Sequence, residues 1–184
     1  MKLHQLLLAF FTLLFGTLVT KGQISKVNTV VDSSVRVFDD FKYKLRLHVF
    51  NTEASDETQP NAILTLKYMG NFEDKIFLKD SLYCMKPWIQ FKDFNQDGEN
   101  DIVIFNTSSA RSNWTHYLYI VDKKKHKLIQ VAGFSKLSNP DIIKESGLIT
   151  SFSVFGNTVV HSYYKITKNY TLVKASKDYE ETIN

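Results

Sequence analysis

The segment from Asp93 to Asp101 constrains the fold most, because a cation-binding pattern stands there directly before a strongly apolar run. Oxygen-bearing side chains occupy loop positions 1, 3, 5 and 9, and a glycine occupies position 6. With this spacing, a short loop can supply the oxygen ligands, about six or more, that Ca²⁺ requires. Gly98 can adopt the positive φ that such a tight turn needs. The pattern predicts a calcium loop, and an ordinary turn rich in Asp, Asn and Gly is the alternative.

Five residues of this loop are the predicted Ca²⁺ ligands, and Glu99 acts through its backbone carbonyl while the others act through their side chains. They are Asp93, Asn95, Asp97, Glu99 and Asp101. An EF-hand would have a bidentate Glu at position 12, where this chain has Ile104. The run Ile102–Phe105 lacks alternation, so it predicts a strand buried on both faces. We therefore expect the loop to join two strands and the ion to be structural, because no poised base is visible near it.

The N-terminal residues predict a secretory signal peptide over residues 1–22. A basic start is followed by an apolar run from Leu6 to Val19 and by small residues at the usual cleavage spacing. The run is shorter than the roughly 20 residues of a membrane-spanning helix, so an uncleaved anchor is the less favoured alternative. The mature chain is expected to begin at Gln23, to be periplasmic or secreted, and to have no membrane association.

Composition limits the classes of protein that remain. Without residues 1–22, Lys+Arg falls from 23 to 21 against 19 Asp+Glu, which leaves a formal charge of +2 and disfavours nucleic-acid binding. No Pro/Gly-rich linker divides the rest, so we expect a single domain over residues 23–184, less ordered up to about residue 41. Cys84 is the only cysteine. It excludes an intrachain disulfide, and we expect it to be buried and unreactive.

Alternation of apolar and polar residues predicts an all-β fold. Tyr43–Phe50 and Ala62–Tyr68 have the period of half-buried strands, and no segment has a sustained helical period. A Val-rich patch near Val30 predicts a first strand, and Phe72–Leu82 is compatible with a strand or a helical turn. The remaining predicted strands are Trp88–Phe91, Ile102–Phe105, Trp114–Val121, Lys127–Phe134, Leu148–Val154, Val159–Thr167 and Tyr170–Ala175. Their order predicts a single antiparallel meander.

Catalytic motifs are not visible in the sequence. The histidines at positions 48, 116, 126 and 161 have no Ser, Cys or Asp at a motif spacing, and there is no G-x-S-x-G, H-E-x-x-H or phosphate loop. We therefore expect a protein that is not an enzyme. The Lys-rich run 123–127 has two interpretations, a polyanion site or a solvated hairpin tip, and the second is favoured because the rest of the chain does not extend the patch.

Several segments in a fixed order resemble a family of small secreted bacterial proteins. They are Phe91–Phe105, Trp114–Ile120, Leu137–Pro140, Leu148–Phe152 and Tyr164–Val173, and the resemblance covers roughly residues 85 to 175. Members of that family resemble β-propellers with calcium loops, and some inhibit lysozymes or act as immunity proteins against peptidoglycan hydrolases. This chain departs from the family in having only Phe155–Thr158 where the family has a glycine-rich loop, and in having one cation motif.

The resemblance implies a protein that binds and inhibits a peptidoglycan-cleaving hydrolase by placing a loop in its cleft. Candidate contacts are Arg111, Trp114 and Tyr163, because large side chains and Arg near loops are frequent interface anchors. The alternative for Trp114 and Tyr163 is a place in the core. An adhesion or glycan-binding module is the alternative function: coplanar exposed aromatic rings would favour it, whereas one protruding loop would favour the inhibitor.

Overall fold

The computed structural model describes residues 29–33, 37, 38, 40–52 and 54–183. Thirteen strands in these residues form three antiparallel sheets, so the predicted all-β class is confirmed. The predicted signal peptide, residues 1–22, lies outside the described residues. In the described part of the chain, no helix is long and apolar enough to cross a membrane.

Sheet A contains the first four strands in the order β1-β2-β3-β4. They are β1 (Thr29–Ser33), β2 (Tyr43–Val49), β3 (Ala62–Tyr68) and β4 (Lys75–Leu82). The predicted alternation is confirmed, because β2 buries Leu45 and Leu47 and exposes Lys44 and Arg46. The segment Phe72–Leu82, which the sequence left open, contains strand β4.

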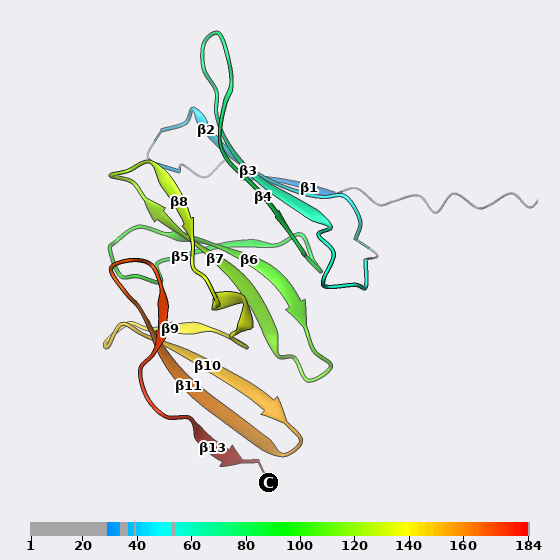
Figure 1. Ribbon diagram of the computed structural model, residues 1–184, viewed down its shortest axis with the longest axis vertical. Helices are drawn as coiled ribbons and strands as arrows, with labels where there is room; N and C mark the ends of the chain where they lie inside the picture. The colour runs from blue at the N-terminus through cyan, green and yellow to red at the C-terminus, as the bar shows by residue number, and fades with distance from the viewer. Residues whose placement is uncertain (1–28, 34–36, 39, 53, 184) are drawn as a thin grey trace, which may run out of the picture.

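Sheet B follows in the chain and lies between the other two sheets (Figure 1). Its strands are β5 (Ile89–Lys92), β6 (Asp101–Ser108), β7 (Trp114–Asp122) and β8 (Lys127–Gln130). Every residue from Ile102 to Phe105 is buried, as predicted. The reason is the central place of the sheet: Ile102 packs toward sheet A, whereas Val103 packs toward sheet C.

Sheet C contains the last strands, and two of them are not predicted from the sequence. Its strands are β9 (Asp141–Ile143), β10 (Leu148–Phe155), β11 (Thr158–Ile166), β12 (Leu172–Lys174) and β13 (Tyr179–Thr182). Both β12 and β13 pair with β11, and β9 pairs with β10. The predicted strand Lys127–Phe134 is too long, because β8 ends at Gln130 and Phe134 begins the 3-10 helix η1 (Phe134–Lys136).

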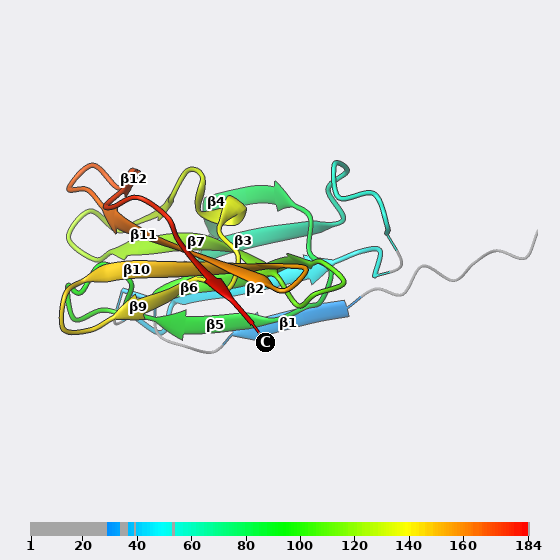
Figure 2. The same cartoon turned by 90° about the horizontal axis from the view of Figure 1, so that it is seen from below.

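Two hydrophobic clusters join the three sheets. The first packs Leu45, Leu64 and their neighbours against Tyr119 of β7, and the second packs Leu118 and Ile149 around Phe134. Most strands of the three sheets run in similar directions in the view from below, as in aligned sheet packing (Figure 2). The described strands form an open stack rather than a closed barrel or ring, so the outer faces of sheets A and C are left uncovered by them.

Candidate functional site

The predicted cation loop connects β5 to β6 within sheet B, as expected of a loop between two strands. Gly98 has φ 90°, which confirms the positive φ predicted for it. Gln96, which has φ 57°, donates a hydrogen bond from its side-chain Nε2 to the backbone carbonyl oxygen of Lys144 at 2.6 Å. This bond fastens the loop to the turn between β9 and β10. The loop therefore contacts both sheet B and sheet C.

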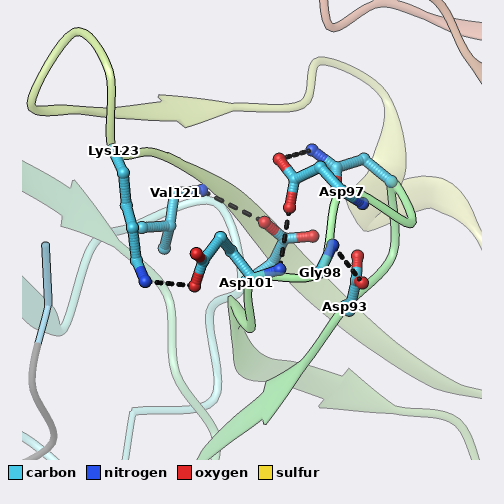
Figure 3. Close-up of polar contacts among 8 residues, drawn as sticks. Asp93, Asp97, Gly98, Asp101, Val121 and Lys123 are labelled. Carbon is cyan, nitrogen blue, oxygen red and sulfur yellow. Dashed lines mark hydrogen bonds and ion pairs between the residues drawn. The ribbon is translucent and has the colours of Figure 1, made fainter. Parts of the chain in front are cut away.

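Side-chain oxygens in the loop accept hydrogen bonds from the backbone of the same loop. Asp93 accepts from the Gly98 amide at 2.9 Å, and Asp97 accepts from the Glu99 amide at 2.9 Å (Figure 3). Asn95 Oδ1 accepts from the Asp97 amide at 3.1 Å. Asp and Asn side chains commonly hold tight turns in this way. The turn conformation is thus supported by the protein's own hydrogen bonds.

Asp101 is fully buried at the start of β6. Its Oδ2 accepts the Phe94 amide at 2.9 Å. Its Oδ1 accepts the Val121 amide at 3.1 Å (Figure 3). Burial raises the pKa of its carboxyl to about 7; the two amides lower that pKa, and the charges of Asp97 and Asp93 raise it. Asp101 therefore joins the loop to β7 through its side chain.

The donor types in the loop fit a calcium ion. Asp93 Oδ1 is buried and has no hydrogen-bond partner in the described part of the chain, as expected of an oxygen reserved for a cation. The Glu99 carboxylate forms an ion pair with Lys123, which leaves its backbone carbonyl as the predicted ligand. However, no group of three His, Cys, Asp or Glu side chains among residues 29–183 that the structure describes is placed to hold a metal. Calcium binding therefore stays a prediction that rests on donor chemistry and spacing.

Two of the three predicted contact residues lie on the hairpin between β6 and β7. Arg111 donates from Nη1 to the Gly156 carbonyl oxygen at 2.6 Å, which ties this hairpin to the turn between β10 and β11. Trp114 is exposed (41%) rather than part of the core. Tyr163 is half-buried in β11, where its neighbour Tyr164 packs into the core between sheets B and C, so Tyr163 faces the outer side of sheet C. The structure does not gather these three residues on one surface.

Trp114 borders a hollow of about 590 Å³ at the edge of sheet B. Trp88, Met85 and Phe105 also line it, together with small polar residues of the β6–β7 hairpin. The rings of Trp88 and Trp114 have centroids 6.2 Å apart and an interplanar angle of 83°. Because the two rings are almost perpendicular, they do not form the flat platform on which a sugar chain stacks.

The hairpin loop between β3 and β4, which was assigned no functional role from the sequence, projects beyond sheet A (Figure 1). Phe72 near its tip is fully exposed (104%), and Ile76 at its base is exposed as well. A Cβ atom on Gly70 would lie 2.2 Å from the carbonyl oxygen of Glu73, so the turn is tight enough to require glycine there. The available signal was the Gly70-Asn71 turn followed by an apolar residue with no alternating partner.

An aromatic row on the outer face of sheet C was also missed. Phe152, His161 and Tyr179 occupy paired positions on β10, β11 and β13. The ring centroids of Phe152 and His161 are 6.3 Å apart, and those of His161 and Tyr179 are 5.9 Å apart. In each pair the ring planes are tilted by 38°. The row is accessible, because Phe152 and Tyr179 are both exposed. β13 supplies the third ring, so the row was not visible without that strand.

His116 provides a pH-dependent contribution to stability. It is buried, its Nδ1 has no hydrogen-bond partner among the described residues, and burial lowers its pKa from the ordinary value of 6.5. As the pH falls below that value, His116 takes up a proton more readily in the unfolded chain than in the folded chain, so the stability of the fold decreases as the pH decreases. Above that value, His116 is neutral in both states. When the pH is lowered from about 7.5 to about 5.5, we expect the free energy of unfolding to decrease less in His116→Phe than in the wild type. Urea titrations at the two pH values measure this difference.

The matched control for this prediction is His126→Gln, which changes an exposed histidine. Asp101, whose pKa is raised, has the opposite effect on the pH dependence of stability, because its protonation stabilises the fold as the pH falls below about 7. This effect is the same in the wild type, in His116→Phe and in His126→Gln. The comparison between variants therefore isolates His116. A pH slope that is the same in His116→Phe and in the wild type would contradict the prediction.

Comparison with known proteins returned no match: no family model matches the chain, and neither does any curated protein or solved structure. The family resemblance drawn from the sequence therefore stays a hypothesis.

Proposed function

We propose that this chain is a periplasmic or secreted, calcium-binding β-protein that inhibits a peptidoglycan-cleaving hydrolase by inserting a loop into its cleft. The observation that supports this proposal is the projecting β3–β4 hairpin with Phe72 near its tip. A fully exposed aromatic side chain has no role in the stability of the fold, whereas buried aromatic anchors often dominate binding energy. The protein acts by binding and requires no catalytic group of its own.

The hairpin is suited to insertion because it is held firmly at its base. Strands β3 and β4 pair along their whole length, and Leu64 and Leu66 anchor β3 in the core between sheets A and B. At the turn, Gly70 permits the close approach of the Glu73 carbonyl. A loop that is ordered before docking loses less conformational entropy when it binds. This arrangement corresponds to the occlusion mechanism expected from the sequence, with a different loop from Phe155–Thr158.

Calcium in the β5–β6 loop has a structural role in this proposal. Asp93, Asn95, Asp97 and Asp101 with the Glu99 carbonyl would hold the ion, and the bound ion would neutralise the loop's carboxylates. The loop contacts sheet C through Gln96 and contacts β7 through Asp101. Calcium would therefore strengthen the joint between sheets B and C.

Calcium is expected to raise the melting temperature of the protein. At about ten times the dissociation constant, one ion adds about 1.4 kcal/mol to the free energy of unfolding. For a domain of this size that corresponds to a shift of about 3 to 6 °C. The measurement is differential scanning fluorimetry with increasing calcium, on the wild type and on Asp97→Ala.

Asn100→Ala is the control for this titration, because Asn100 is an exposed loop residue that is not a predicted ligand. It should keep the full calcium shift, whereas Asp97→Ala should lose it. No shift in the wild type, or equal shifts in both variants, would remove the calcium proposal.

The propeller-like part of the predicted fold belongs to the same proposal. Each of the three sheets consists of antiparallel strands that are mostly consecutive in the chain, and the sheets pack face to face in chain order. Successive propeller blades have the same organisation. The open stack would then correspond to a part of such a ring.

A pull-down from the periplasmic and secreted fractions of the native cells, with and without a calcium chelator, tests the proposed function. We expect recovery of a peptidoglycan hydrolase whose activity on purified wall falls when the protein is added. Recovery of glycan alone, or of a hydrolase whose activity does not change, would reject inhibition.

The alternative, a calcium-stabilised adhesion or glycan-binding module, is favoured by the aromatic row on sheet C. Its three rings are tilted by only 38° from one to the next, and exposed aromatic rows of this kind can stack on sugars. Sedimentation with insoluble wall polysaccharide distinguishes the two functions. Binding that is lost in Tyr179→Ala and retained in Phe72→Ala would support the glycan-binding function.

A further inference from the structure

The outer face of sheet A carries a hollow of about 680 Å³. It lies on the side of the sheet away from the core, because the residues that line it on β2 and β3, apart from Leu45, alternate with the buried ones. Four cationic side chains line it, and they come from three adjacent strands. They are Lys44, Arg46, Lys67 and Lys79. This hollow is unrelated to the calcium loop, which lies in sheet B.

Strand pairing places these cations in adjoining positions. Lys44 is directly opposite Lys67, and Lys79 is opposite Thr65. Like charges that face each other across two strands repel and reduce the stability of the sheet. A bound anion would remove this repulsion. The arrangement is therefore more favourable when the hollow is occupied by negative charge.

Few acidic side chains of the protein neutralise the positive charge of the lysines at this hollow. In the described part of the chain, no ion pair involves Lys44, Lys67 or Lys79, and Asp74 is the one acidic residue among those that line the hollow. Arg46 stands opposite Asp32 of β1 in the strand register, which leaves the three lysines as the cations without an acidic residue opposite them.

The Lys-rich β7–β8 turn differs from this hollow, because Lys123 pairs with Glu99 and Lys125 pairs with Asp122. That turn is exposed at its tip, which agrees with the solvated hairpin favoured from the sequence.

We propose that the outer face of sheet A binds a linear polyanion that bears phosphate groups. Lysine ammonium groups bind phosphate as point charges, which suits a flexible chain that can adjust its groups to them. The volume lies in the range of sites that hold a small ligand or a short chain segment. Among the described residues that line it there is no Phe, Tyr or Trp, and His48 supplies the one aromatic ring, so successive nucleobases would have no row of rings on which to stack.

The apolar residues of the hollow fit the parts of such a chain between its phosphates. Ile63 and Ile76 line it beside the lysines and can contact aliphatic links. The proposed ligand is thus an anionic chain in which phosphate groups alternate with less polar units. The hollow borders the base of the β3–β4 hairpin through Met69, Asp74 and Ile76, so its ligand is tested on the purified protein without a hydrolase.

Fluorescence anisotropy of the purified protein with labelled linear polyphosphate tests the proposal. We expect the wild type to bind with an affinity that falls steeply as salt rises, because binding releases counterions. The double variant Lys44→Glu/Lys67→Glu should bind about tenfold more weakly or worse, because two contacts become repulsive. A second variant, Lys44→Gln/Lys67→Gln, should also lose affinity, and it should fold at least as well as the wild type because it removes the repulsion between the two lysines.

Lys124→Glu/Lys127→Glu is the matched control, because it makes the same change of charge at the exposed β7–β8 turn. It should bind within about twofold of the wild type if the site is local. Equal losses in the two charge-reversed variants would show attraction by net charge only and would overturn the site. Tighter binding of polyaspartate than of polyphosphate, or binding only to phosphatidylglycerol vesicles, would overturn the proposed ligand in favour of an acidic polypeptide or a membrane surface.

Discussion

In calcium-free buffer, Asp101→Ala is expected to lower the free energy of unfolding by about 3 kcal/mol, the largest effect of any substitution in the cation loop. The carboxylate is fully buried and accepts the backbone amides of Phe94 and Val121. Both of those residues are themselves buried, so removing the carboxylate leaves two amides without a partner. Each unsatisfied buried amide costs about 1 to 3 kcal/mol.

Two effects reduce the sum of those costs. Burial of the carboxylate is itself unfavourable near neutral pH, as its pKa of about 7 indicates, and this cost disappears in the variant. A water molecule can also enter the space left by the side chain and bind one amide. The expected loss therefore lies near the middle of the range, and it corresponds to a fall of about 6 to 12 °C in melting temperature.

Asp97→Ala is the control for this measurement, because Asp97 is exposed and belongs to the same loop. Urea unfolding with a chelator present should give a change within about 1 kcal/mol for Asp97→Ala. If Asp101→Ala is equally mild in that buffer, Asp101 is not the structural link between the loop and β7. The chelator matters because a bound ion would add its own contribution to both variants.

The position of Asp101 in the loop was predictable from the sequence, but its contact with β7 was not. Spacing alone places Asp101 at position 9 of a calcium loop, and the structure places it at the end of that loop as expected. Its bond to the Val121 amide was not predictable, because Val121 lies 20 residues later in the chain, on β7. Long-range pairing of this kind depends on the register of β6 with β7, which the local pattern does not specify.

Strands with a regular pattern were predicted well, and strands that depend on a partner were not. The alternation in β2 and β3 follows directly from burial on one face, and the apolar run in β6 follows from burial on two faces. By contrast, β9 follows Pro140 directly and has only three residues, and β13 is exposed throughout. Each exists because it pairs with the edge of β10 or β11. A short edge strand has little apolar pattern of its own.

The same limit applies to the exposed surfaces. Lys44 and Lys67 belong to strands that sequence reasoning found, and their outward orientation was predictable from alternation. Their direct opposition across β2 and β3 was not, because it requires the register of the pair. Likewise, the exposure of Phe72 depends on how far the hairpin projects from sheet A.

Phe72→Ala is expected to weaken inhibition of the target hydrolase by about hundredfold, which is about 2.7 kcal/mol of binding energy and lies within the range of aromatic anchors at interfaces. The side chain is fully exposed in the free protein, so its removal should leave the melting temperature unchanged. An inhibition constant measured on purified wall substrate, together with a melting curve, therefore separates loss of contact from loss of fold.

Phe155→Ala is the matched control, because Phe155 is an exposed phenylalanine at the end of β10, where the family has its glycine-rich loop. It should keep full inhibition. Gly70→Ala is expected to reduce inhibition about tenfold without removing Phe72, because its Cβ atom forces the turn to open and the loop must then be reordered on binding. Inhibition that survives Phe72→Ala but not Trp114→Ala would place the contact on the β6–β7 hairpin and reject the β3–β4 hairpin as the inserted element.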